Sequence, residues 1–260
     1  MIYTASMLTH TISSGANHLR TLVCIHGFLG DYEAFFDLFK PLASHYRVLS
    51  IALPYHHSSH EYADSMASFC EGLVELLDFY SIKDADFYGY SMGGRLSMCF
   101  AYLYPERVST LFIESAHFGF SKQHDKQISA KSIDQQTQVF KVDTTSEFLD
   151  KWYDMPLFQK TKQRLSEDSI NKKRQLHLAE LQQLFERFHV STQPAVLESI
   201  QQHGIPILYF AGELDQKYVN LSQALISASA ENKRFIIANA DHCVHCCDSQ
   251  AIFTQLLTNK

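Results

Sequence analysis

Strand and helix patterns alternate along the first 117 residues, and this alternation constrains the fold more than any other feature of the sequence. Parallel strands need long crossover connections, which are usually helices. The alternation therefore predicts a mostly parallel, doubly wound α/β sheet. Buried strands are expected at TLVCIH (21–26), YRVLSIALP (46–54), DADFYGY (84–90) and VSTLFIES (108–115). Apolar residues recur at helical spacing between these runs.

The alternation stops near His117. Residues 118–202 are rich in Gln, Lys, Ser and Asp and show helical periodicity without a convincing strand, which predicts an inserted helical cap. The sheet pattern then resumes at PILYFAG (206–212) and KRFIIAN (233–239). We therefore expect a core formed by 1–117 and 203–260, with a cap at 118–202.

Composition narrows the class of protein. The chain is 46% hydrophobic with a net charge of −6 and has no basic stripe, so a nucleic-acid partner is not expected. No apolar run approaches the roughly 20 residues of a membrane span, and Met1 to Arg20 lacks the pattern of a signal peptide. The pattern of the six cysteines is not that of a disulfide framework. A reducing compartment is therefore the simpler interpretation. We expect a cytoplasmic monomer.

The motif Gly89-Tyr90-Ser91-Met92-Gly93 lies between an expected strand and an expected helix. That context is the one a G-x-S-x-G nucleophile elbow requires, because the serine occupies a strained turn that small neighbours must accommodate. We interpret Ser91 as a nucleophile. The Met92 amide, at a helix N-terminus, and the Phe28 amide, after His26-Gly27, are expected to form an oxyanion hole.

The partners of such a serine should follow in the order acid, then histidine. Asp215 comes just after the strand PILYFAG, and His242 comes just after KRFIIAN. Both positions are carboxyl ends of strands, where open α/β sheets assemble their sites. His242 would take the serine proton and Asp215 would orient the imidazole. Glu213 and Asp241 are neighbouring carboxylates, and Glu114 is an alternative acid.

The segment from His242 to Asp248 is rich in cysteine and histidine. A zinc site needs about four ligands, usually from two separated pairs, and no second pair lies at that spacing. Coordination by His242 would also remove the general base. We therefore expect no metal and no cofactor.

HGFLGDYEAFF, GYSMGGR, AGELD and NADHCVH together resemble the α/β-hydrolase superfamily across nearly the whole chain. Within it the sequence is similar to two bacterial cytosolic groups. One contains the pimeloyl-carrier-protein methyl ester esterases of biotin synthesis. The other contains the synthases that eliminate pyruvate to make 2-succinyl-6-hydroxy-2,4-cyclohexadiene-1-carboxylate in menaquinone formation. GYSMGGR, IESAHFGF and DKWYDMPLF are similar to the synthase.

The simplest interpretation of Trp152 and Tyr153 is that they form the cap's own core, whereas the resemblance implies substrate-facing roles for them. Tyr90, beside the nucleophile, is expected in the pocket wall. Arg95, one turn into the helix after Ser91, could form a structural ion pair or bind a substrate carboxylate.

Two departures count against the synthase. Both groups commonly carry a P-G-H-G loop where this chain has Pro54-Tyr55-His56-His57. The synthase pattern also has arginines early in the cap, which suit a polyanionic substrate, whereas residues 123–134 offer only Lys126 and Lys131.

A basic segment of the cap points towards the esterase. Six cations and two acidic residues within fifteen positions leave a local charge of +4, which could steer an acidic carrier protein, although a solvated helix face is the plainer interpretation. The cations are Lys160, Lys162, Arg164, Lys172, Lys173 and Arg174.

We therefore predict a serine carboxylic ester hydrolase with an acyl-enzyme intermediate, acting on a small-molecule or acyl-carrier-protein-bound ester. The specific expectation is the pimeloyl methyl ester esterase. The alternatives are the pyruvate-eliminating synthase and a non-catalytic binding protein that kept the fold.

Overall fold

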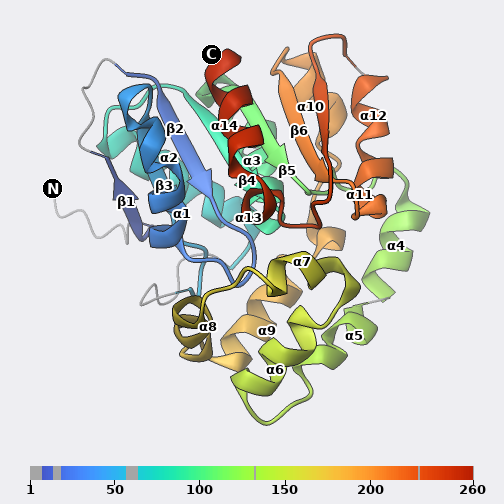
Figure 1. The fold of residues 1–260 in the computed structure, drawn as a ribbon. Helices are drawn as coiled ribbons and strands as arrows, with labels where there is room; N and C mark the ends of the chain where they lie inside the picture. The colour runs from blue at the N-terminus through green and yellow to red at the C-terminus, as the bar shows by residue number, and fades with distance from the viewer. Residues whose placement is uncertain (1–7, 14–18, 57–63, 132, 228, 260) are drawn as a thin grey trace, which may run out of the picture.

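A computed structural model describes residues 8–13, 19–56, 64–131, 133–227 and 229–259. Its centre is a seven-stranded sheet with the strand order β1-β3-β2-β4-β5-β6-β7 (Figure 1). The strands are β1 (His10–Ile12), β2 (Thr21–Ile25), β3 (Arg47–Ile51), β4 (Ala85–Tyr90), β5 (Val108–Glu114), β6 (Ile207–Gly212) and β7 (Lys233–Ile237). Neighbouring strands from β3 to β7 are parallel, and β1 pairs antiparallel with β3. The predicted mostly parallel α/β sheet is confirmed.

The strands β2 to β7 lie within the six runs predicted from the sequence. β1 was not predicted. β1 has only three residues, and all three are half-buried, so it gives no apolar run for a pattern to detect. It forms an edge through its pairing of His10 with Ile51.

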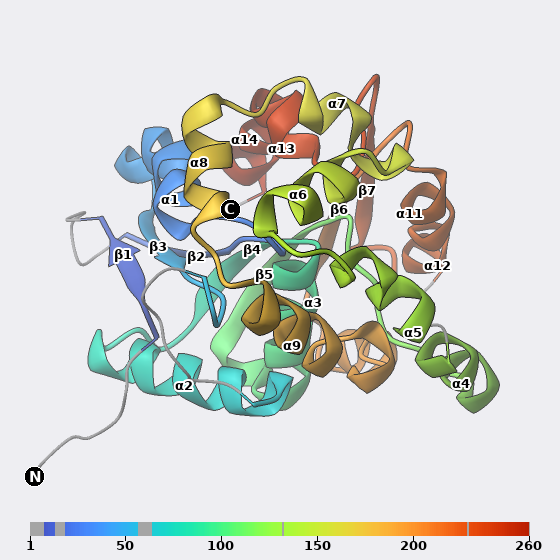
Figure 2. The ribbon, with the colours of Figure 1, turned by 90° about the horizontal axis from the view of Figure 1, so that it is seen from below.

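Helices cover both faces of the sheet because strand side chains alternate between them. In β2, Leu22 and Cys24 pack towards one face, and Val23 and Ile25 pack towards the other. The helices on the first face are α1 (Tyr32–Phe39) and α14 (Ser249–Thr258), and those on the second are α2 (Met66–Phe79) and α3 (Met92–Leu103) (Figure 2). Shorter helices near β6 and β7 are α11 (Gln216–Leu221), α12 (Gln223–Ile226) and α13 (Val244–Cys247).

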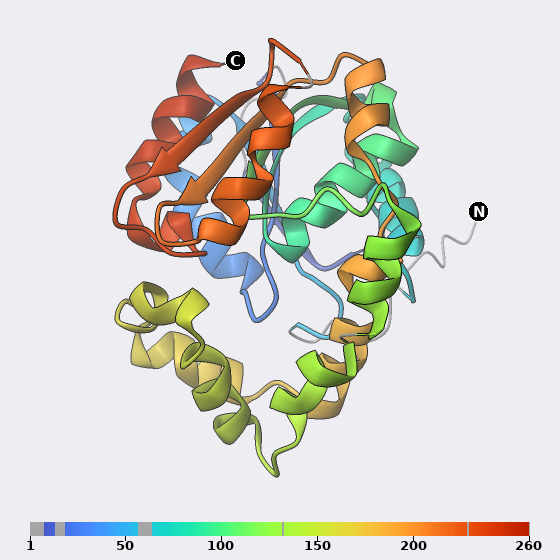
Figure 3. The ribbon, with the colours of Figure 1, turned by 90° about the vertical axis from the view of Figure 1, so that its right-hand side faces the viewer.

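Among the described residues, the connection from β5 to β6 contains helices and no strand. Its α-helices are α4 (Gln123–Lys131), α5 (Ile133–Gln136), α6 (Thr145–Tyr153), α7 (Gln159–Lys162), α8 (Glu167–Arg174), α9 (Leu178–Arg187) and α10 (Leu197–Gln202). Its 3-10 turns are Thr137–Phe140, Pro156–Phe158 and Val190–Thr192; two further turns, Lys40–Ser44 and Pro105–Arg107, lie in the core. Most of the connection lies across the carboxyl end of the sheet (Figure 3). The division into core and cap at 118–202 stays a prediction.

The helices α6 and α9 share an apolar cluster of their own. Phe148, Leu149 and Leu181 are buried there together with Phe140. Leu29, from the loop after β2, is part of the same cluster, so this loop is packed directly against the cap helices.

Within the part of the chain that the structure describes, no helix has both the length and the apolar character that a membrane span requires.

Candidate active site

The turn between β4 and α3 holds Ser91 in an unusual backbone conformation. Its φ of 50° and ψ of −109° lie in a region that residues with a side chain rarely adopt. The turn is fixed because the Ser91 N–H donates to the carbonyl of Glu114 on β5 at 2.8 Å. The hydroxyl is thereby presented above the carboxyl end of the sheet.

The two glycines of the motif are required by close packing. A Cβ on Gly89 would lie 2.5 Å from the Ser97 Oγ, and one on Gly93 would lie 2.1 Å from the Ile25 carbonyl oxygen. Helix α3 can approach β4 and β2 this closely only without those side chains. The G-x-S-x-G spacing thus follows from the contact between the elbow and its neighbouring strand.

Ser91, His242 and Asp215 are brought together from three different strand ends. The His242 Nε2 lies 3.0 Å from the Ser91 Oγ, and the His242 Nδ1 lies 2.7 Å from the Asp215 Oδ2. Both His242 and Asp215 are buried. In the tautomer that satisfies these contacts, Nδ1–H donates to the carboxylate and Nε2 accepts from the hydroxyl, as a general base must.

The other carboxylates considered as acids have different partners. Glu213 accepts from the Asn239 N–H at 2.9 Å, and Asp241 accepts from the N–H and hydroxyl of Thr161, both at 2.8 Å. Glu114 accepts from His245 rather than from His242. Asp215 is therefore the carboxylate that the structure places on the His242 imidazole.

Histidine side chains fix the loop that carries the Phe28 amide. The Leu29 N–H donates to the His56 Nε2 at 2.9 Å, and the Leu53 N–H donates to the His26 Nε2 at 3.2 Å. Burial lowers the pKa of His26 to about 3, with His56 adding to the effect, so His26 stays neutral and can accept. His56 belongs to the segment that departs from the P-G-H-G pattern, and His57 lies outside the described residues.

The residues of both predicted oxyanion donors line the cavity that Ser91 lines. Met92 is the first residue of α3, so its N–H has no acceptor within the helix. Phe28 lines the same cavity as Ser91 and Met92. Their role as oxyanion donors stays a prediction.

A cavity of about 270 Å³ adjoins Ser91 and His242, and we call it the seryl cavity. Two cations line it: Arg95 on α3 and Lys217 on α11. None of its described lining residues is Asp or Glu. The Arg95 guanidinium donates to the Phe188 carbonyl at 2.5 Å, and within the described part of the chain no carboxylate forms an ion pair with it. The seryl cavity is therefore electropositive.

Two histidines in this cavity add hydrogen-bonding groups rather than charge. Burial lowers the pKa of His117 to about 4, and Lys217 and Arg95 contribute to the shift. The pKa of His189 is lowered to about 4 for the same reasons, with Arg95 the larger of the two charges. Burial also lowers the pKa of Arg95, to about 10, which leaves the guanidinium charged at neutral pH.

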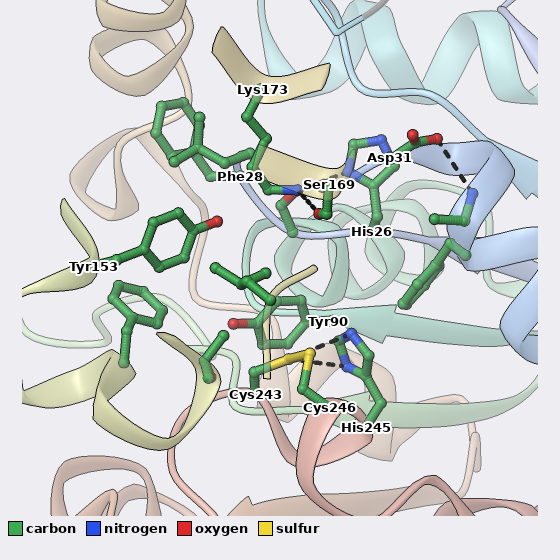
Figure 4. Close-up of a pocket in the computed structure, with 18 of the residues that line it drawn as sticks. His26, Phe28, Asp31, Tyr90, Tyr153, Ser169, Lys173, Cys243, His245 and Cys246 are labelled. Atoms are coloured by element: carbon green, nitrogen blue, oxygen red, sulfur yellow. Dashed lines mark hydrogen bonds between the residues drawn. A yellow bond between two sulfur atoms is a disulfide. The ribbon is translucent and has the colours of Figure 1, made fainter. Parts of the chain in front are cut away.

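The residues expected to face substrate divide between two cavities. Arg95 and Trp152 line the seryl cavity. Tyr90 and Tyr153 line a second cavity of about 280 Å³, which we call the thiol cavity because Cys243 and Cys246 lie in its wall (Figure 4). Trp152 borders both. Tyr90 and Tyr153 are thus absent from the described lining of the seryl cavity.

The basic cap segment keeps four of its six cations exposed, and two of these pair with carboxylates. Lys162 pairs with Asp154 at 2.5 Å, and Lys172 pairs with Asp31 at 3.4 Å. Lys173 is only 8% exposed; it donates to Ser169 inside the thiol cavity, where burial lowers its pKa to about 8.

The other two exposed cations donate hydrogen bonds to neighbouring groups, and Lys160 is half-buried. Arg164 donates to the carbonyls of Cys246 and Cys247 at 3.1 and 2.7 Å, and Arg174 donates to Asn171 at 2.9 Å. Docking of a carrier protein by this segment stays a prediction, without Lys173 among the exposed groups.

Sequence reasoning missed several groups of the seryl cavity. His117 lies three residues after the end of β5, and Lys217 follows Asp215 by two residues, so the rule that strand ends carry the site could have found both. Gln136 and His189 come from the cap and gave no such signal.

The structure also contains a disulfide between Cys243 and Cys246, which the sequence analysis did not expect. Cys24, Cys70 and Cys99 are buried free thiols, in keeping with their apolar surroundings. The disulfide joins residues only three positions apart, so it closes one local turn and does not amount to a framework.

Comparison with known proteins gives a consistent family. A model of the alpha/beta hydrolase fold matches residues 20–246. The 2-succinyl-6-hydroxy-2,4-cyclohexadiene-1-carboxylate synthase of Enterobacter sp. (strain 638) is 28% identical over 227 residues, which cover 86% of this chain and 85% of the relative. The solved structure of MenH from S. aureus superposes with a TM-score of 0.85 at 23% identity, covering 97% of both chains. A hydrolase from Pseudomonas aeruginosa PA01 gives a TM-score of 0.77 at 18% identity, covering 96% of this chain and 93% of that one.

Proposed function

We propose that this chain, which belongs to the α/β hydrolase fold family, eliminates pyruvate from a polycarboxylate to form 2-succinyl-6-hydroxy-2,4-cyclohexadiene-1-carboxylate. One observation carries the proposal: the seryl cavity presents Arg95 and Lys217 and has no acidic residue among its described lining. The name of the Enterobacter relative supports the same activity. The order of preference from the sequence, esterase before synthase, is therefore reversed.

The positive charge of the seryl cavity removes the objection that the early cap lacks the arginines expected for a polyanionic substrate. The product named above has a carboxylate on its ring and another on its succinyl arm, and the pyruvate unit of the precursor adds a third. Cations in a partly desolvated cavity bind such groups through charge-assisted hydrogen bonds. Here α3 and α11 supply the cations, so arginines early in the cap are not needed.

The contact between Ser91 and His242 suits removal of a proton beside a carbonyl group. The His242 Nε2, 3.0 Å from the Ser91 Oγ, takes the hydroxyl proton, and the oxygen then accepts the proton of the ring carbon that bears the succinyl ketone. The Phe28 and Met92 amides would stabilise the charge that develops on the ketone oxygen.

The electron pair of the broken C–O bond leaves with the pyruvate unit. The C–H electron pair forms a ring double bond, the existing ring double bond shifts, and the C–O bond to the pyruvate unit breaks. The leaving group departs as the enolate of pyruvate and recovers the proton. No water is consumed and no acyl-enzyme forms, which distinguishes this elimination from ester hydrolysis.

The test is release of pyruvate from the enolpyruvyl precursor by the purified protein, measured with a lactate dehydrogenase coupling system. We expect turnover by the wild type and its loss in Ser91→Ala and His242→Gln. Circular dichroism of both variants checks that they fold. Wild-type protein that binds the precursor but releases no pyruvate would refute the proposal.

Carboxylic ester hydrolysis is the second candidate, and the same Ser91–His242–Asp215 contacts favour it. In that reaction Ser91 would attack the ester carbonyl and form an acyl-enzyme. The pimeloyl-carrier substrate is the specific form of this candidate. Charge reversal at Lys172 and Arg174 should then weaken turnover of the carrier-bound ester more than turnover of a short p-nitrophenyl ester, and equal losses would remove carrier docking.

A further inference from the structure

The thiol cavity gathers three side chains that can donate to a metal ion. Cys243 caps the N-terminus of α13, and His245 and Cys246 lie within this short helix, just after His242. One ligand atom from each of the three lies within 4.8 Å of the others. Figure 4 shows them together in the wall of the cavity, across from Lys173.

A buried carboxylate orients the imidazole of this group. The His245 Nδ1 lies 2.9 and 3.0 Å from the two oxygens of Glu114, and the His245 backbone N–H donates to the same carboxylate at 3.2 Å. Glu114 is fully buried and also accepts from the Tyr88 hydroxyl. A carboxylate so placed keeps the proton on Nδ1 and leaves the Nε2 lone pair for a ligand, which is the usual support of a metal-binding histidine.

The distances suit a small tetrahedral site. The His245 Nε2 is the nearer of the two ring nitrogens to the Cys243 Sγ, at 3.4 Å against 3.6 Å for the Nδ1. A zinc ion with bonds of about 2.0 Å to nitrogen and about 2.3 Å to sulfur separates two such ligands by about 3.5 Å at the tetrahedral angle. The spacing Cys-x-x-Cys is common among zinc ligands. The donor set has no oxygen, so it does not suit Mg²⁺ or Ca²⁺.

We propose that the reduced chain binds one zinc-class cation through Cys243, His245 and Cys246, with the fourth position open to the thiol cavity. The disulfide of the structure is the oxidised form of the same site, and the two forms exclude each other. A small dithiol can interconvert them. It breaks the Cys243–Cys246 bond, transfers two electrons and two protons to the sulfurs, and becomes a disulfide itself. Binding of the cation then releases the two thiol protons to water.

His242 need not take part, which removes one of the two reasons for expecting no metal from the sequence; the other, the lack of a second Cys/His pair, leaves the proposed site with three protein ligands. Its Nδ1 contacts Asp215 and its Nε2 contacts Ser91, so both nitrogens face away from the proposed ligands. The neighbouring Cys247 also lies apart, with its Sγ 3.8 Å from the Asp241 Oδ1. The proposed cation site and the Ser91 site can therefore be occupied together, and the cation site does not depend on the proposed elimination.

The experiment is anaerobic titration of the full chain with CoCl₂ after reduction by a phosphine that is then removed. Tetrahedral Co²⁺ bound to thiolates gives charge-transfer absorption in the near ultraviolet and intense visible bands. We expect both at one Co²⁺ per chain, loss of both in Cys246→Ser, and wild-type spectra in the matched control Cys247→Ser. Oxidised protein should give neither band.

A second variant separates ligation from folding. Glu114→Gln keeps the shape of the side chain and should weaken Co²⁺ affinity about 10- to 100-fold, the usual effect of losing such a supporting carboxylate. Reduced wild-type protein that lacks the thiolate bands would overturn the proposal. Equal bands in the oxidised protein or in Cys246→Ser would also overturn it, because the ion would then be bound elsewhere.

Discussion

The seryl cavity and the thiol cavity share a wall formed by Phe28, Trp152 and Phe158, yet they offer opposite chemistry. The seryl cavity combines a serine–histidine pair with cations that suit carboxylates. The thiol cavity offers two sulfurs and an imidazole, donors that suit a soft cation. Adjacent residues of one loop, His242 and Cys243, serve the two cavities. The comparison teaches that a short turn at the end of β7 can supply two separate sites.

The largest expected effect tests whether the chemistry belongs to the seryl cavity alone. Ser91→Ala should lower turnover by about 10⁴-fold or more, as loss of a triad member does in other serine enzymes. Co²⁺ binding by the reduced variant should equal that of the wild type. Steady-state pyruvate release and the cobalt titration measure the two. A variant that keeps a tenth of its turnover would show that Ser91 is not the reacting group.

The next effect concerns the charge of the seryl cavity. Arg95→Met should raise the KM for the precursor about 10- to 100-fold, because one hydrogen bond to a charged group contributes about 1.5–3 kcal/mol. Arg95→Lys should recover part of that loss. The matched change Lys217→Met should cost less, because Lys217 is exposed whereas Arg95 is partly buried. Unchanged KM values in both methionine variants would contradict a carboxylate-binding cavity.

Trp152→Ala removes the largest side chain of the wall that the two cavities share. Its indole stacks on Phe158 at 5.6 Å between ring centroids and contacts Phe28 at 5.0 Å. Since Trp152 is half-buried, we expect a loss of about 2 kcal/mol in unfolding free energy, below the 3–5 kcal/mol of a fully buried site. Joining the cavities should also lower kcat/KM. Urea denaturation measures the first effect, and Trp152→Phe is the conservative control.

The smallest effect is the response of stability to acid. His117 and His189 have pKa values of about 4 in the folded chain and about 6.5 when unfolded. Between these values the unfolded chain binds more protons, so stability is fully present above pH 6.5 and falls as the pH drops towards 4. His189→Gln should make this decline shallower in denaturation midpoints measured from pH 7 to pH 5. An equally steep decline in the variant would show that His189 is not one of the responsible groups.

The fold was predictable because its signals are local. The apolar runs of β2 to β6 are fully or almost fully buried, and runs of this kind show in the sequence without any alignment. The contacts of Ser91 with His242 and of His242 with Asp215 agree with positions read from strand ends. β1 was not predicted because its three half-buried residues show no alternation of buried and exposed positions.

The features that the sequence did not predict depend on packing between segments that are distant in the chain. Nothing local distinguishes Lys173, which turns inward to Ser169, from Lys172, which pairs with Asp31 at the surface. His245 looked like one more residue of a cysteine-rich tail, and its meaning emerges only when β5 brings Glu114 to its Nδ1. The charge of the seryl cavity likewise needs α3 and α11 to meet. Sequence patterns indicate which face of a helix or strand is buried, whereas these features form where different helices and strands meet.

The central claim is that the seryl cavity selects a polycarboxylate for elimination. The most direct measurement compares, in one preparation, kcat/KM for pyruvate release from the enolpyruvyl precursor with kcat/KM for hydrolysis of a carrier-bound pimeloyl methyl ester. We predict that pyruvate release is faster by at least about 100-fold, the combined effect of two charge-assisted contacts. Faster hydrolysis of the methyl ester, with no detectable pyruvate, would contradict the claim and return Ser91 to acyl transfer.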